Sequence, residues 1–312
     1  MILYFSSPVA LVIAYAIFSS DLRQAIFVKP HNRGNEGSKL HLELISQLQK
    51  ISQIVAHSLG VSFTQISFKD YLLVKPDIIE SSLAINSNGA NGIIINGSDS
   101  YCIFGFNNYF RFLRTKIKLK RLFRNNFRVH SKAILYSYTK HPEKLKSQNE
   151  AINQFEVVQL LNRLAPKVFE GLGQNIESII NQDCILVLPP IHKYTGNDFS
   201  LRFMKSVEIF AKEHNLKVFV KPHRNDETNY TLSLIDKSLL LGDKLDFRTV
   251  PVEFFFTLKH VLYIMAVPSS SLALSKEINS QVLVPKNRQL FRKSFLDQVP
   301  FLESIGIKVQ KI

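Results

Sequence analysis

Cysteine is nearly absent from this chain of 312 residues, which contains only Cys102 and Cys184. Two thiols are too few for a disulfide scaffold or a four-thiolate metal site, so we expect a reducing compartment. The sequence also lacks Gly-x-Gly-x-x-Gly, a Walker loop, His-Glu-x-x-His and paired Cys-x-x-Cys. These absences leave little support for dinucleotide redox chemistry, ATP hydrolysis, zinc proteolysis or structural zinc.

The start of the chain lacks a long apolar run. Ser6-Ser7-Pro8 separates apolar residues 2–5 from residues 9–18, and neither piece reaches the roughly 20 residues of a membrane span. No Lys or Arg precedes the run, whereas a secretory signal begins with basic residues. We therefore expect a buried strand and a helix in a cytoplasmic protein; a short signal anchor is the alternative.

Positive charge is in excess, with a formal net charge of +14 and a pI near 9.7. Such a charge attracts polyanions, whether acidic glycans, anionic lipids or nucleic acid. Residues 109–132 are rich in Lys and Arg and contain no Asp or Glu. An amphipathic helix there predicts peripheral contact with an anionic membrane at its inner face, or with a polyanionic acceptor; a solvated helical face is the alternative. Nucleic acid is not expected, because no RNA-binding or helix-turn-helix pattern accompanies the charge.

Short apolar runs alternate with longer helical patterns along both halves of the chain. Predicted strands lie at residues 2–5, 25–28, 92–95, 133–136, 184–188, 217–220, 261–264 and 281–285. Predicted helices lie at residues 9–18, 39–58, 107–124, 198–214 and 272–278. This alternation predicts an α/β protein with parallel strands. The polar stretch 141–150 predicts a linker, which divides the chain into domains 1–145 and 146–312.

Two polar loops follow predicted strands of the second half. In Lys221-Pro222-His223, the imidazole can bind a phosphate or protonate it as it leaves, while Lys221 and Arg224 add positive charge. In Ser269-Ser270-Ser271, hydroxyls and free N–H groups at a helix start can hold a phosphate without metal. The alternatives are a surface loop with a satisfied histidine and an ordinary serine helix cap.

The two loops, in this order, resemble the HP and SS motifs of bacterial sialyltransferases, including polysialyltransferases and lipooligosaccharide sialyltransferases. Pro251-Val252-Glu253 is similar to the Pro-x-Glu step that lies between those motifs, and residues 2–11 are similar to the first strand and turn. The resemblance implies a GT-B fold, in which two Rossmann-like domains have parallel sheets that face a central cleft. The first domain would lie on the acceptor side, and the second would bind the nucleotide sugar.

The resemblance also implies an inverting glycosyltransferase without a metal or a separate cofactor. Its donor would be a CMP-activated sugar such as CMP-sialic acid, and its acceptor a cell-surface glycan of capsule or lipooligosaccharide. His223 would be catalytic, and Arg224 stands where the family usually has proline. The residues implied to contact the donor are Lys221, Pro222, His223, Arg224, Glu253, Ser269, Ser270 and Ser271.

The first half departs from the family where an acidic-acidic-glycine motif is expected. The matching stretch is residues 93–101, and Asn96 occupies the position of the catalytic base. An amide cannot take up a proton at neutral pH, so Asp99 would replace it, with His31 a further candidate. Otherwise the chain is a non-catalytic relative that binds nucleotide or glycan. A teichoic-acid-type transferase with a CDP-polyol donor is a third hypothesis, and a membrane- or nucleic-acid-binding protein is a fourth.

Overall fold

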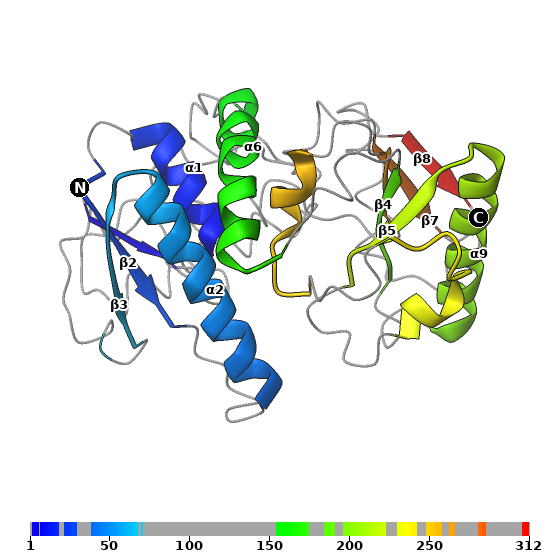
Figure 1. The fold of residues 1–312 in the computed structure, drawn as a ribbon, viewed down its shortest axis with the longest axis horizontal. Coiled ribbons are helices and arrows are strands. Elements are labelled where there is room, and N and C mark those ends of the chain that lie inside the picture. Colours follow the sequence, from blue (N-terminus) through cyan, green and yellow to red (C-terminus); the bar gives the residue numbers. More distant parts are fainter. Residues whose placement is uncertain are drawn as a thin grey trace, which may run out of the picture. The chain divides into compact units, whose positions relative to one another are not determined.

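The protein forms two compact units, Met1–Leu172 and Gly173–Ile312, in the computed structural model shown in Figure 1. Each unit is described by itself. The structure describes residues 2–5, 7–18, 22–29, 39–67, 70, 154–174, 184–190, 196–222, 230–241, 248–257, 262–265, 280–284 and 308–311.

The first unit contains a parallel sheet with strand order β1-β2-β3. Its strands are β1 (Ile2–Phe5), β2 (Gln24–Val28) and β3 (Ser62–Ile66). Leu3 pairs with Ala25, and Gln24 pairs with Ser62. The rings of Phe5 and Phe27 meet edge to face in the core, with centroids 5.7 Å apart. This arrangement is among the preferred geometries of an aromatic pair.

Three described helices belong to the first unit, namely α1 (Pro8–Phe18), α2 (Lys39–Ser58) and α6 (Gln154–Gly171). Pro8 occupies the first helical position of α1, where its missing N–H costs no hydrogen bond. Helix α1 carries no charged residue and packs against both α2 and α6. Because α6 packs on these helices, the division between the units falls at Leu172/Gly173, whereas the sequence predicts it at 145/146.

Two helices end in the same hydrogen-bonded turn, in which a residue with positive φ reverses the chain. After α2, Gly60 has a φ of 71°, and the N–H of Val61 donates to the carbonyl of Ala56 at 2.9 Å. After α9 (Asn197–Glu213), Asn215 has a φ of 51° and takes the equivalent place. These are the Schellman geometries that Gly and Asn favour, because left-handed backbone costs them little.

The second unit contains a parallel sheet with strand order β5-β4-β6-β7-β8. The strands are β4 (Cys184–Leu188), β5 (Lys217–Val220), β6 (Leu262–Met265), β7 (Ser280–Val284) and β8 (Lys308–Lys311). From β4 the chain passes to β5 on one side and later to β6 on the other. The order therefore reverses at β4, which makes β4/β6 the topological switch point of a doubly wound sheet.

The second sheet is covered on both faces. Helix α9 buries Phe203 and Val207 in one cluster with Val218 and Val220. Burial of each large apolar side chain stabilises the fold by about 1.5–3 kcal/mol. Phe219 points to the opposite face, because side chains alternate along a strand. There it contacts Phe255 of the 3-10 helix η6 (Val252–Thr257). A second 3-10 helix, η5 (Tyr230–Leu234), packs against α9.

The structure confirms an α/β protein with parallel sheets. The predicted strands 2–5, 184–188 and 217–220 and the helix 39–58 are found with the same bounds. Strands β3 and β8 and helix α6 are not predicted from the sequence. The predicted strands 92–95 and 133–136, the helices 107–124 and 272–278 and the linker 141–150 lie outside the described residues. No helix in the described part of the chain is long and apolar enough to cross a membrane.

Candidate functional site

The candidate site lies at the carboxyl edge of the second sheet, where β5, β4 and β6 are neighbours. Parallel strands end at the same edge, and doubly wound sheets bind ligands there, at the switch point. In the sequence, the predicted loop Lys221-Pro222-His223 follows β5, and the predicted loop Ser269–Ser271 follows β6. With β4 between them, the strands that precede these loops lie roughly 9.5 Å apart, two inter-strand spacings.

The topology brings the starts of the two predicted phosphate-binding loops to one edge. His223, Arg224, Ser269, Ser270 and Ser271 themselves lie outside the described residues. Their convergence on one nucleotide stays a prediction. The first-half candidates Asn96, Asp99 and His31, and the basic segment 109–132, also lie outside the described residues.

Lys221 is held in the fold by both its main chain and its side chain. Its N–H donates to the carbonyl of Val187 at 2.9 Å, which continues the pairing of β5 with β4. Only 7% of the residue is exposed. Its ammonium group donates to the carbonyls of Pro222 at 3.3 Å and Arg248 at 3.4 Å. A buried charge requires such partners, because an unsolvated ammonium is otherwise costly.

Glu253 lies near Lys221, although the two residues are far apart in the sequence. Burial raises the pKa of the Glu253 carboxyl above its ordinary value, while its own backbone N–H and the positive charge of Lys221 act in the opposite direction. The residue as a whole is partly buried, so it is the carboxyl group that the surrounding protein desolvates. Desolvation favours the neutral acid, which can donate as well as accept a hydrogen bond.

Aromatic packing fixes the 3-10 helix that carries Glu253. Phe254 and Phe255 are buried, and the ring of Phe255 lies 5.3 Å from that of Phe219, centroid to centroid. The N–H of Phe254 donates to the carbonyl of Pro251 at 3.2 Å. Because Phe219 is the neighbour of Val220 on β5, this contact holds η6 beside the end of that strand.

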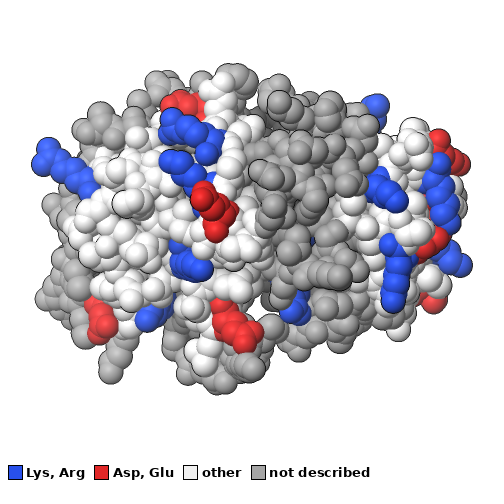
Figure 2. All heavy atoms as spheres, in the orientation of Figure 1, with Lys and Arg blue, Asp and Glu red and all other residues white. Residues whose placement is uncertain are grey.

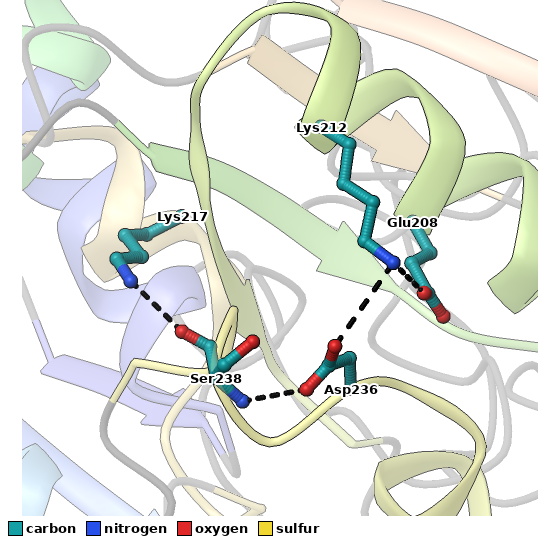
Figure 3. A network of polar contacts seen from close by, with 5 residues as sticks. All are labelled: Glu208, Lys212, Lys217, Asp236 and Ser238. Carbon is teal, nitrogen blue, oxygen red and sulfur yellow. Dashed lines mark hydrogen bonds and ion pairs between the residues drawn. The ribbon is translucent and has the colours of Figure 1, made fainter.

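A second polar cluster lies at the opposite end of β5 (Figure 3). Lys217, the first residue of β5, donates to the carbonyl of Ser238 at 2.8 Å. The N–H of Ser238 donates to Asp236 at 2.9 Å, and Lys212 of α9 pairs with both Glu208 and Asp236. Exposed pairs of this kind contribute little stability each. The cluster ties the start of β5 to the turn 236–240, away from the candidate site.

Hydrogen bonding and charge shift two pKa values in this cluster. The N–H of Ser238 is the main cause that lowers the pKa of Asp236, with its hydroxyl and the charges of Lys212 and Lys217 adding to the effect. The hydrogen bond to Glu208 raises the pKa of Lys212. Both shifts favour the charged forms.

On the face of the molecule shown in Figure 2, acidic and basic side chains of the described residues are interspersed.

The residue that sequence reasoning misses at the site is Arg248. Its contribution is a main-chain carbonyl that accepts from Lys221, and a carbonyl gives no signal in the sequence. Within the described ranges, no three His, Cys, Asp or Glu side chains gather to hold a metal ion; a metal-independent site stays a prediction.

Comparisons with known proteins give no family for this chain. No protein-family model matches the sequence. No curated protein matches it either.

Proposed function

We propose that the chain is a sialyltransferase-like inverting glycosyltransferase with a GT-B fold. A CMP-activated sugar, CMP-sialic acid first among them, would bind at the carboxyl edge of β5, β4 and β6. One observation carries this proposal: the ammonium group of Lys221, in the first motif, donates to the carbonyl of Arg248 at 3.4 Å, in the segment that leads directly into Pro251–Glu253 of another motif. This contact supports the proposal that the two motifs serve one donor at the edge where such sheets bind ligands.

The proposed chemistry is the displacement of CMP by an acceptor hydroxyl. In this proposal His223 protonates the departing phosphate, and Ser269–Ser271 donate hydrogen bonds to it. Asp99 takes the proton of the acceptor hydroxyl, because Asn96 cannot. The acceptor is a cell-surface glycan. The basic segment 109–132 binds either a polyanionic acceptor of this kind or the anionic inner face of the membrane.

The test is CMP release from CMP-sialic acid in the presence of candidate glycan acceptors. We expect release by the wild-type protein and a loss of about 10²–10⁴-fold in His223→Ala, the usual contribution of a general acid. Ser270→Ala should also reduce release. Matched controls are His214→Ala and Ser206→Ala, which make the same substitutions on or beside α9. No release and no CMP binding would contradict the proposal.

Because Asn96 occupies the position of the catalytic base, it favours a second candidate function, in which the chain binds the nucleotide sugar but does not transfer the sugar. In that case CMP binds, wild-type protein releases none, and Asn96→Asp gains transfer. Release of CMP from a CDP-polyol, with none from CMP-sugars, would instead indicate the polyol phosphotransferase. Binding to anionic vesicles or oligonucleotides without any nucleotide binding would indicate a function of the basic segment alone, and a salt series would identify it.

A further inference from the structure

Lys221 is buried where a ligand-binding lysine would need to be open. Its exposed fraction is 7%, and its ammonium group is directed to main-chain carbonyls of its own unit. One of these carbonyls belongs to the adjacent Pro222. The other belongs to Arg248, 27 positions further along the chain. The side chain therefore joins the end of β5 to the segment that leads into η6.

The segment after Arg248 carries Glu253 to the candidate site. Its far end is fixed by the contact of Phe255 with Phe219. Its near end is fixed by the hydrogen bond from Lys221 to Arg248. Residues 249–254 thus run between two attachments, one to Phe219 on β5 and one to Lys221, the residue that follows β5. Glu253 lies near the lysine itself, as the effect of the Lys221 charge on its carboxyl indicates.

We propose that Lys221 is a positioning residue, which attaches the Arg248–Glu253 segment to the end of β5 and so sets the place of Glu253. It is not a ligand of the donor phosphate. The attachment itself follows from the contacts of this unit. Its consequence for nucleotide binding rests on the proposed function.

The attachment is tested by hydrogen exchange, which needs no nucleotide. Lys221→Met keeps the length of the side chain and removes the ammonium group. We expect the amides of residues 249, 250 and 252–254 to exchange at least about tenfold faster, because a lost hydrogen bond from a charged donor corresponds to that factor or more; Pro251 has no amide hydrogen. The matched control is Lys217→Met, the same substitution at the other end of β5, which should leave these amides unchanged.

Lys221→Met also leaves the Glu253 carboxyl without the positive charge that acts on it, which destabilises the variant if this carboxyl is ionised. The double variant Lys221→Met/Glu253→Gln removes both charges and covers that case. It still lacks the bond to Arg248, so we expect the same faster exchange in residues 249–254. Unchanged exchange in a folded single or double variant would overturn the proposal.

The consequence for the ligand is tested with CMP and with cytidine, which lacks the phosphate. If Lys221 is a positioning residue, Lys221→Met weakens the binding of CMP and of cytidine by the same factor. We expect this factor to be about tenfold, equivalent to about 1.4 kcal/mol. Lys221→Arg keeps the positive charge and should recover part of the loss. A loss confined to CMP would show a direct phosphate contact and overturn the proposal.

The two proposals fail in distinguishable ways. If the wild-type protein binds neither CMP nor cytidine, the nucleotide site is wrong, and the exchange experiment alone decides whether Lys221 attaches the segment. If CMP binds and the exchange rates do not change, the nucleotide site stands and Lys221 is not its positioning residue.

Discussion

The contact between Phe219 and Phe255 offers a quantitative test of how η6 is held beside β5. Replacing each ring by leucine, singly and together, gives a double-mutant cycle. The ring centroids lie 5.3 Å apart with an interplanar angle of 39°, within the range in which aromatic pairs add about 0.5–1.5 kcal/mol beyond burial. Both residues are 1% exposed. We therefore expect a coupling free energy of about 0.5–1.5 kcal/mol.

The assay must report on the second unit, because a chain of two compact units need not unfold in one transition. Hydrogen exchange of β4 and β5 amides under mildly denaturing conditions gives the free energy of opening for that sheet. Tryptophan fluorescence cannot replace this assay, because the chain contains no tryptophan. Each single substitution should lower this free energy by about 0.5–3 kcal/mol, the usual range for point mutations.

The control cycle combines Phe203→Leu with Phe255→Leu. Phe203 packs with Val218 and Val220 under α9, on the face opposite to Phe219. These two substitutions should add to within about 0.5 kcal/mol, as substitutions without shared partners usually do. The reasoning is refuted if the Phe219/Phe255 cycle is equally additive, or if the control cycle shows the larger coupling.

Three further predictions concern protonation and backbone geometry. Burial raises the pKa of Glu253, so the folded state binds the extra proton and the stability of the wild-type protein falls as pH rises from the ordinary glutamate value of 4.5 through the raised one. Glu253→Gln should remove this dependence, so its melting temperature relative to wild type should rise with pH; a relative fall would contradict the assignment. The pKa of Asp236 is lowered, so its stabilisation is present above 3.8 and is lost as pH falls through the folded value. Asp236→Asn should be less stable at pH 7, and a difference that persists unchanged at pH 2 would be inconsistent with this. Gly60 has a φ of 71°, and a Cβ added there would meet no atom within 4 Å, so Gly60→Ala should lower the free energy of unfolding by about 1–2 kcal/mol through the backbone alone. Asn215→Gly, in the same turn after α9, should not lower the melting temperature; equal losses in the two variants would argue against the turn geometry.

The strands and helices that sequence reasoning predicts are those with strong apolar patterns. Residues 184–188 and 217–220 form strands that are almost wholly buried, so their composition alone is informative. The side chains of β3 are mostly exposed or partly exposed, and its position follows from pairing with β2. Helix α6 has Pro166 in its interior, which local rules take as the end of a helix.

The place of the candidate site could be predicted in part. A polar loop after a buried strand is visible in the sequence at Lys221, and the strand order then decides which loops share an edge. The order β5-β4-β6 is a non-local property that pattern and spacing do not reveal. The surroundings of Lys221 could not be predicted either, because its partners are main-chain carbonyls and its burial depends on a segment distant in the sequence.

The central claim is that CMP binds at the carboxyl edge of the second sheet, and the most direct test is hydrogen exchange with and without saturating CMP. We predict protection at the amides of residues 221, 223 and 224 and of residues 269–271, and none at residues 236–240 beside the start of β5. Protection only at residues 236–240, or none anywhere in Gly173–Ile312, would contradict the account.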